Sequence, residues 1–355
     1  MTQTPLPLLT EIVHRWHAAA VLETVSPLTP DASLRRYYRL GLSGAPVAHL
    51  VAMVFDSVAS PEHSGVGAVG SDQAYVELTR FFRAHGVAVP ELYFDARAQS
   101  VLLIEDLGDI ALADIAQGKE PLPFGSGSVE LLYRQAIDTI IRLQSIPAAA
   151  DCFAYQRAFT APQYRREMEE FVDYVLGGPG EPASAVAGAF FDELAEELGA
   201  LPRVLAHRDF HSWNLLVAEG RVRVIDFQDA LLATKPYDLV GLLNDRDTDA
   251  LLGQEAYWRL VEYFQQESSY GTSFPSDYDR VLLQRDLKVA GRFRKLVTER
   301  GLDRYQVWVP GTLRRIGRTL ERLAQRGDLS PKGQTFLAAV QGNVFLPEVE
   351  SSDEC

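Results

Sequence analysis

One short stretch of β-type sequence interrupts the mostly helical second half of the chain, and this stretch most constrains the fold. From residue 109 onward, apolar residues recur at spacings near 3.6, which is typical of amphipathic helices. Between residues 204 and 230, two short apolar runs at 215–217 and 222–225 instead predict a β-hairpin. The sequence therefore predicts a helical region that carries one β island.

Polar side chains with a defined spacing occupy this island. His207-Arg208-Asp209 opens it, Asn214 follows Asp209 by five residues, and Asp226 follows Asp209 by 17. Phosphoryl transfer from Mg-ATP needs a carboxylate that orients the attacking hydroxyl and accepts its proton. It also needs an amide oxygen and a second carboxylate that hold Mg²⁺ on the phosphates. A salt-bridged turn or a plain strand end explains each motif alone, but their order and spacing together favour the catalytic interpretation.

The first half of the chain has a different pattern, in which short strands dominate. We expect helices near 8–20 and 75–82, and strands at 37–40, 47–55, 91–94 and 101–105. These elements predict an α+β chain of two lobes. A small β-rich N-lobe spans 1–107 with a short connector at 105–107, and a large helical C-lobe spans 108–355 and carries the polar β island at 205–230.

Composition limits the classes of protein to consider. The chain has 355 residues, of which 47% are hydrophobic and 23% charged, as in an ordinary globular protein. Its net charge of −14 argues against a nucleic-acid or membrane-surface partner, so any phosphate must be bound by a local site. The two cysteines, Cys152 and Cys355, form no disulfide framework, and no signal peptide or long apolar run is visible. We therefore expect a cytoplasmic protein.

The motifs of the island resemble those of the protein-kinase-like phosphotransferases. Protein kinases usually carry a lysine two residues after the catalytic aspartate, whereas aminoglycoside phosphotransferases and choline kinases usually carry a histidine. This chain has His211 at that position, and it has Asp226-Phe227-Gln228 in place of the protein-kinase DFG motif. The resemblance implies a bilobal protein-kinase-like fold with a hinge at 105–107 and a catalytic loop at 205–230. It also implies a small-molecule kinase in which Asp209 and His211 are the catalytic residues.

A narrower resemblance covers most of the chain. It is carried by four stretches, at 31–39, 102–109, 226–239 and 284–289. They are similar to motifs of the bacterial N-acetylmuramate/N-acetylglucosamine anomeric sugar kinases of cell-wall recycling. The resemblance implies transfer of the ATP γ-phosphate to the anomeric hydroxyl of an N-acetylated amino sugar. That hydroxyl is more acidic than an ordinary alcohol, so positioning by Asp209 can suffice.

The chain departs from the general kinase pattern at Met53. In most kinases the corresponding strand presents a lysine to the phosphates, paired to a helix glutamate such as Glu77. No lysine occurs in residues 1–118. We expect Arg35 and Arg36, with Ser33 as a further donor, to bind the phosphates instead. The alternative is that both arginines are a solvated charge run.

The resemblance implies further roles. The backbone of Glu105 and Leu107 would contact adenine, Leu216 would lie below the base, and Asn214 and Asp226 would bind Mg²⁺. Asp238 is expected to anchor loop or helix backbone, since buried N–H groups near such a loop require acceptors. The basic stretch from Arg285 to Lys295 reads as a solvated helix face, with contact to a sugar carboxylate as the less favoured alternative.

The sequence leaves three interpretations of the function open, and it leaves the oligomeric state open as well. The first interpretation is a Mg-ATP-dependent anomeric sugar kinase. Another small-molecule kinase of the aminoglycoside, choline or homoserine type is the alternative within the fold. From a different class, the missing lysine allows a catalytically inactive nucleotide-binding protein, although Asp209, Asn214 and Asp226 are all present. We expect a monomer or weak homodimer.

Overall fold

The computed structural model describes residues 6–28, 35–55, 71–123 and 127–341. The chain packs into two compact units that are interleaved in sequence. The first unit comprises Met1–Arg157 and Trp213–Ala230, and the second comprises Ala158–Ser212 and Leu231–Cys355. The lobe boundary predicted after residue 107 is a different division of the chain, and it stays a prediction.

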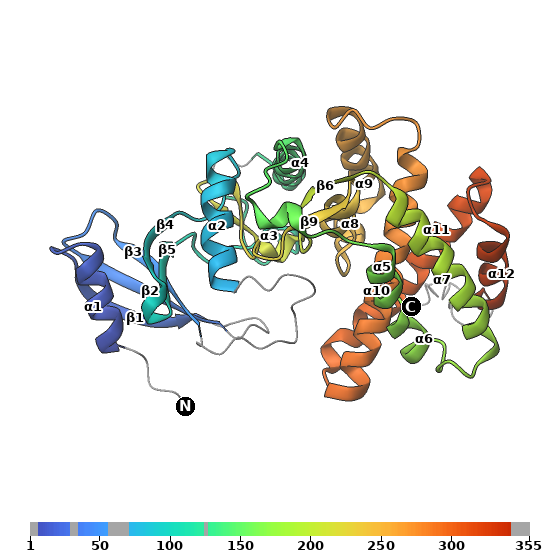
Figure 1. Cartoon of the computed structure of the whole chain (residues 1–355), viewed down its shortest axis with the longest axis horizontal. Coiled ribbons are helices and arrows are strands. Elements are labelled where there is room, and N and C mark those ends of the chain that lie inside the picture. The colour runs from blue at the N-terminus through green and yellow to red at the C-terminus, as the bar shows by residue number, and fades with distance from the viewer. Residues whose placement is uncertain (1–5, 29–34, 56–70, 124–126, 342–355) are drawn as a thin grey trace, which may run out of the picture. The chain divides into compact units, whose positions relative to one another are not determined.

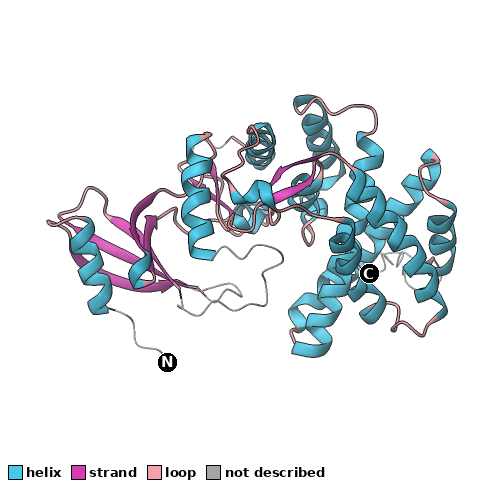
Figure 2. Cartoon of the chain, in the orientation of Figure 1, coloured by secondary structure: helices cyan, strands magenta, loops and turns pink. Residues whose placement is uncertain are grey.

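The first unit is built on a five-stranded antiparallel sheet with strand order β1-β2-β3-β5-β4 (Figures 1 and 2). Its strands are β1 (Val21–Leu28), β2 (Arg36–Ser43), β3 (His49–Val54), β4 (Leu92–Ala96) and β5 (Val101–Glu105). Its helices are α1 (Leu6–Trp16), α2 (Ser71–Ala84), α3 (Leu112–Ala116) and α4 (Val129–Ser145). The predicted β island forms the hairpin of β7 (Leu215–Ala218) and β8 (Arg221–Val224).

The core of this sheet lies under α1. Leu9, Ile12 and Val13 share one face of the helix because they are three or four residues apart, and all three are buried. They pack with Leu40 and Leu50 among the buried side chains of the sheet. Strand β1 was not predicted, because it contains Pro27 and because its exposure does not alternate as in a half-buried strand.

The second unit is mostly helical. It contains α5 (Ala161–Glu167), α6 (Glu169–Tyr174), α7 (Pro182–Ala200), α8 (Tyr237–Asn244), α9 (Thr248–Glu267), α10 (Phe274–Arg300), α11 (Val309–Arg326) and α12 (Pro331–Val340). Two short strands, β6 (Arg203–Ala206) and β9 (Leu231–Thr234), pair antiparallel within it. Helix α10 is 27 residues long and packs against α6, α8 and α11. Together with the sheet of the first unit, these helices confirm the predicted α+β class.

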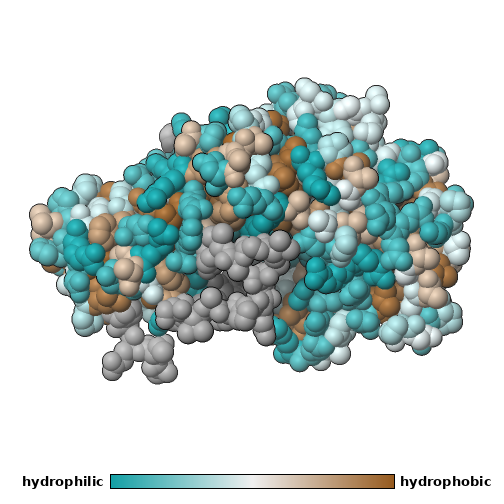
Figure 3. Space-filling model, in the orientation of Figure 1, coloured by the Kyte–Doolittle hydropathy of each residue, from teal (hydrophilic) through white to brown (hydrophobic). Residues whose placement is uncertain are grey.

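Within the described residues, no helix is both long and apolar enough to cross a membrane. Figure 3 shows hydrophobic residues scattered among hydrophilic ones on the face in view.

Candidate active site

The loop that contains Asp209 begins where β6 ends, and helix α8 holds its backbone in place. Asp238 of α8 accepts hydrogen bonds from the backbone N–H groups of His207, at 2.6 Å, and Arg208, at 3.0 Å. Arg208 has φ 81°, a left-handed conformation that is uncommon for a residue other than glycine. A buried acceptor for two adjacent N–H groups fixes this bend of the loop. The prediction that Asp238 anchors the loop is confirmed.

The charges around Asp209 favour its ionised form. Burial raises the pKa of the carboxyl, but Lys288, Arg208, Arg285 and His211 together hold that pKa below the usual 3.8. An ionised carboxylate can accept a proton from a hydroxyl and can orient it by hydrogen bonding. The electrostatics of the second unit therefore suit the role that the sequence predicts for Asp209.

His211 lies in the same environment and is shifted toward its neutral form. Burial is the main cause that lowers the pKa of the imidazole from 6.5, and Arg285 and Arg246 lower it further. The carboxylates of Asp245 and Asp209 act in the opposite direction. At neutral pH the ring is therefore uncharged, with one nitrogen that donates and one that accepts hydrogen bonds.

The basic stretch of α10 is not a solvated face throughout, so that interpretation is wrong for part of it. Arg285 is only 6% exposed. Lys288 lies one turn later and pairs with Glu167 at 2.7 Å. Arg292, whose side chain is 52% exposed, fits the predicted surface position and pairs with Glu170. The sequence did carry a signal, because Arg285 continues the buried stripe of Tyr278, Val281 and Leu282 at helical spacing.

The predicted metal ligands belong to the first unit, whereas Asp209 and His211 belong to the second. The backbone N–H of Ile225 donates to the carbonyl of Asn214 at 3.0 Å, so Asn214 and Asp226 lie near each other at one end of the β7–β8 hairpin. Asp226 has φ 63° and accepts a hydrogen bond from the Gln228 amide at 2.7 Å.

The donor set of Asn214 and Asp226 fits Mg²⁺. An amide oxygen and a carboxylate are hard oxygen ligands, and Mg²⁺ in kinases is commonly held by one or two such groups plus substrate phosphates. Among the described residues there is no group of three or more His, Cys, Asp or Glu side chains arranged for a metal. A site completed by phosphate oxygens does not require one.

Aromatic packing fixes the turn that contains Asp226. Phe227 is fully buried and stacks on Tyr75 of α2, with 4.9 Å between ring centroids, and it meets Phe82 edge-on at 5.7 Å. Asp226 therefore lies between strand β8 and the buried ring of Phe227, which packs against α2, and these two neighbours hold its left-handed conformation. Neither aromatic partner was predicted.

The residues predicted to bind phosphate are partly described. Ser33 lies outside the described residues. Arg35 is 9% exposed and forms a hydrogen bond with the hydroxyl of Tyr37. Arg35 and Asp226 both act electrostatically on Tyr37 and on Tyr75, so these four side chains lie close to one another in the first unit. This burial argues against a solvated charge run for Arg35, whereas Arg36, at the start of β2, is half-buried.

The position of the usual kinase lysine is apolar in three dimensions too. Met53 is 1% exposed in β3 and faces Tyr37 and Leu102 across the sheet. Glu77 accepts a hydrogen bond from Gln73, one turn earlier in α2, at 2.7 Å. A cation that binds the phosphates must therefore come from another element, as the sequence predicts.

Ion pairs fix the predicted hinge in position. The guanidinium of Arg39 donates hydrogen bonds to both Asp106 and Asp109, and the shortest bond to each carboxylate is 2.6 Å. The carboxylate of Glu105 accepts two hydrogen bonds from Arg223, at 2.5 and 3.1 Å. Such bidentate pairs fix both position and orientation. Leu107 is buried and Leu216 is half-buried in β7, and adenine contact by this connector stays a prediction.

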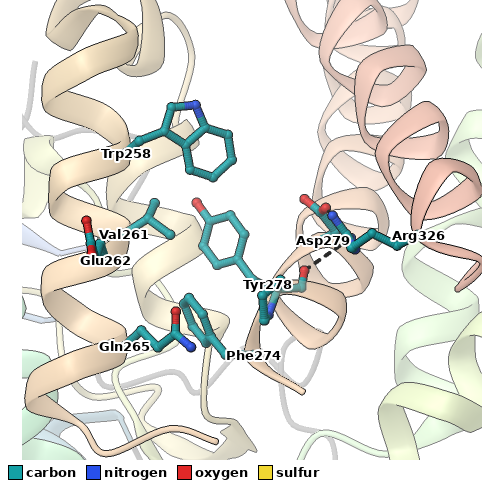
Figure 4. A pocket seen from close by; sticks show the side chains of 9 residues that line it. Trp258, Val261, Glu262, Gln265, Phe274, Tyr278, Asp279 and Arg326 are labelled. Atoms are coloured by element: carbon teal, nitrogen blue, oxygen red, sulfur yellow. Dashed lines mark hydrogen bonds and ion pairs between the residues drawn. The ribbon is translucent and has the colours of Figure 1, made fainter. Parts of the chain in front are cut away.

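A separate pocket of the second unit contains none of the predicted site residues. It has a volume of about 280 Å³ and lies between α9 and the start of α10. Figure 4 shows Trp258 and Val261 on one side and Tyr278 on the other, with Asp279 directed toward Arg326.

Comparison with known proteins identifies the family. Residues 24–272 match the family described as the phosphotransferase enzyme family, which is more than half of the chain. The chain belongs to the phosphotransferase enzyme family. It is therefore an enzyme, a small-molecule kinase, and the predicted enzyme class is confirmed.

Individual relatives support the predicted resemblances. The enzyme is 27% identical over 329 residues to the N-acetylmuramate/N-acetylglucosamine kinase of Pseudomonas aeruginosa, covering 89% of this chain and 88% of that one. The ADP-bound aminoglycoside phosphotransferase APH(2'')-Ib matches with a TM-score of 0.57 at 12% identity, covering 87% and 98% of the two chains. The choline kinase LicA of Streptococcus pneumoniae matches with a TM-score of 0.57 at 13% identity, covering 90% and 99%. The kinase-like fold is thus confirmed.

Proposed function

We propose that this enzyme transfers the γ-phosphoryl group of Mg-ATP to the anomeric hydroxyl of N-acetylmuramate, N-acetylglucosamine or both. The observation that carries the proposal is the environment of Asp209. Four cationic or polar groups favour its ionised form in a loop that Asp238 holds by two hydrogen bonds. A relative that matches nearly nine-tenths of the chain is named for this pair of sugars.

Each predicted residue has a role in the proposed reaction. Asp209 orients the anomeric hydroxyl and takes its proton while the oxygen attacks the γ-phosphorus. The new O–P bond forms as the bond from that phosphorus to the β–γ bridging oxygen breaks, and ADP leaves with the electron pair. Neutral His211 supports the acceptor side by hydrogen bonding.

The nucleotide roles fall to residues of the first unit. Asn214 and Asp226 would hold Mg²⁺, which when bound neutralises charge on the phosphates. Arg35 and Arg36, with Ser33, would bind the phosphates in place of the missing lysine. The backbone of Glu105 and Leu107 would contact adenine, and Leu216 would lie below it. The proposal places the enzyme in the cytoplasm, in recycling of cell-wall sugars.

A substrate panel tests the reaction. The purified enzyme is incubated with Mg-ATP and N-acetylmuramate, N-acetylglucosamine, glucose, kanamycin or choline, and the product is followed by ADP release and phosphorus NMR. A new anomeric sugar phosphate is the expected result. Turnover of kanamycin or choline alone would overturn the sugar assignment but keep the kinase. Nucleotide binding without turnover of any acceptor would favour an inactive nucleotide-binding protein.

Replacement of Asp209 tests the role of the base. Asp209→Asn keeps the shape of the side chain but removes its basicity, so we expect kcat to fall by about 10²–10⁴-fold with ATP affinity nearly unchanged. Asp192→Asn, at an exposed position of α7 that pairs with Arg165, is the matched control and should retain full activity. Unchanged turnover in Asp209→Asn would remove this residue from its proposed role.

A further inference from the structure

Arg285 is a buried cation that has no direct partner in the described part of the chain. Its side chain is 6% exposed, and it makes no hydrogen bond or ion pair with any described residue. Burial disfavours a guanidinium, which remains charged in proteins. Nearby carboxylates favour its charged form electrostatically, but among the described residues no hydrogen bond to the guanidinium is present. Its N–H groups therefore suit a ligand.

Arg315, in the same unit, is a buried arginine with a structural role and serves as a comparison for Arg285. Arg315 is 4% exposed, and its guanidinium donates to Asp286 at 2.8 and 2.9 Å and to Asp249 at 3.0 Å. It also donates to the backbone carbonyls of Arg246 and Asn244. Arg285, next to Asp286 in α10, is equally buried and has none of these contacts. The difference points to a ligand rather than to packing.

The guanidinium of Arg285 lies beside the catalytic loop. Gly241 of α8 contacts both: a methyl group built on its Cα would lie 2.8 Å from the carbonyl oxygen of Phe210 and 3.5 Å from Cζ of Arg285. Phe210 is the residue between Asp209 and His211. The absence of a side chain at Gly241 lets α10 bring the Arg285 guanidinium up to the loop.

Two of the charged groups near Arg285 are paired with other side chains. Lys288, one turn along α10, is neutralised by Glu167, whose other oxygen accepts from Gln284 at 3.1 Å. Asp245 pairs with Arg246 at 2.9 Å. Tyr237, Asp245, Asp209 and Glu167 act electrostatically on Arg285 and raise the pKa of its guanidinium against the effect of burial. The planar fork of a guanidinium matches two oxygens of one oxyanion.

We propose that Arg285 binds an oxyanion beside Asp209, on the acceptor side of the active site. The ligand is a carboxylate of an acidic acceptor or the phosphoryl group that is transferred, since both present two oxygens to the fork. The inference rests on the proposed function for the identity of the acceptor, but the anion site itself can be tested without turnover.

Direct anion binding is the first test. Binding of inorganic phosphate and of lactate is measured by calorimetry at constant ionic strength for the wild type, Arg285→Met and Arg292→Gln. The last is a matched control, an exposed arginine two turns along the same helix. We expect saturable binding of at least one anion by the wild type and the control, and at least tenfold weaker binding by Arg285→Met. Binding that is absent in the wild type, or unchanged in Arg285→Met, would overturn the proposal.

Kinetics identify the source of the oxyanion. N-acetylmuramate carries a carboxylate and N-acetylglucosamine does not. A carboxylate ligand predicts that Arg285→Met raises the KM for the acidic sugar and lowers its kcat/KM relative to the neutral sugar by tenfold or more. A phosphoryl ligand predicts that kcat falls by one common factor for both sugars while the pH dependence of kcat stays the same. A shifted pH dependence would instead reflect the effect of Arg285 on the pKa of Asp209. Phosphorylation of neither sugar by the wild type would defeat the proposed function, while the binding measurement would still decide the anion site.

Thermal unfolding separates ligand binding from misfolding. Replacing an unpaired buried charge by an apolar side chain of similar length should leave the melting temperature of Arg285→Met unchanged or raise it. Arg315→Met removes the partner of Asp286 and should lower it. A folded Arg285→Met that has lost anion binding supports the proposal, and retained binding by that folded variant contradicts it.

Discussion

At the scale of single residues, buried charges decide both stability and chemistry in this enzyme. Arg315 donates to two carboxylates and two carbonyls at once, so its removal leaves buried Asp286 without its hydrogen-bonded counter-charge. We expect Arg315→Met to lower the free energy of unfolding by about 3–5 kcal/mol, measured by urea denaturation. Arg318→Met, on the same helix with its side chain 54% exposed, should change it by about 0.5 kcal/mol or less. Equal effects of the two variants would contradict the structural role of Arg315.

His211 gives the stability a pH dependence of known sign. Its pKa in the folded enzyme is below 6.5, the ordinary value of the unfolded chain, because burial disfavours the charged ring. As the pH falls through 6.5, the unfolded state binds a proton that the folded state does not. The folded state therefore loses stability by up to about 1.4 kcal/mol per pH unit until the pH reaches the folded pKa.

His211→Asn tests this linkage. Urea unfolding of the wild type and the variant is compared between pH 7.5 and 5.5. We expect the free energy of unfolding to fall less steeply with acidification in the variant. Identical slopes would show that the ring titrates alike in both states.

The same residue scale shows what a sequence pattern can miss. Asp238 was predicted correctly, since a loop of this type needs an acceptor for its N–H groups and α8 supplies one. Arg285 was assigned to a solvated face because arginine is usually exposed. Its burial depends on Gly241, 44 residues away in sequence, and no local pattern contains that contact.

At the scale of elements, close helix packing depends on glycine. Gly291 brings α10 onto α6 so closely that an added methyl group would lie 2.5 Å from the backbone carbon of Glu170 and 2.5 Å from the nitrogen of Phe171. Backbone atoms cannot rotate away as a side chain can, so the helices must separate. We expect Gly291→Ala to reduce the free energy of unfolding by about 1–3 kcal/mol in urea denaturation.

Gly311 of α11 provides the control for that change. An added methyl group at Gly311 meets nothing within 4 Å. Alanine is the better helix former, so Gly311→Ala should leave stability unchanged or raise it by up to about 1 kcal/mol. A loss of stability in both variants would mean that helix propensity or the unfolded state, rather than the α6–α10 contact, explains the Gly291 result.

At the scale of the whole molecule, the chain order matters because residues 213–230 complete the first unit. Phe227 packs on Tyr75 and Phe82. In the hairpin, the backbone N–H of Val224 donates to the carbonyl of Ala88, and the N–H of Val217 donates to the carbonyl of Ile110. A chain truncated after Arg157 loses all of these contacts. We expect it to bind a hydrophobic dye and to unfold without a cooperative transition.

A chain that contains both segments of the first unit is the control for this prediction. Residues 1–157 joined to 213–230 by a flexible glycine-serine linker should unfold cooperatively on heating, as measured by near-UV circular dichroism. If the truncated chain unfolds as cooperatively and at the same temperature as the joined one, the hairpin is not needed for the first unit.

The sequence by itself determined the fold class and the family of the enzyme. The spacing of Asp209, Asn214 and Asp226 is local, and helical or strand periodicity is a property of each segment, so the fold class and the family resemblance could be predicted from it. Tertiary structure alone decided which cations are buried and which are paired. Burial and pairing are set by contacts between segments far apart in the chain, as between Arg285, Gly241 and Phe210, and a one-dimensional pattern does not contain them.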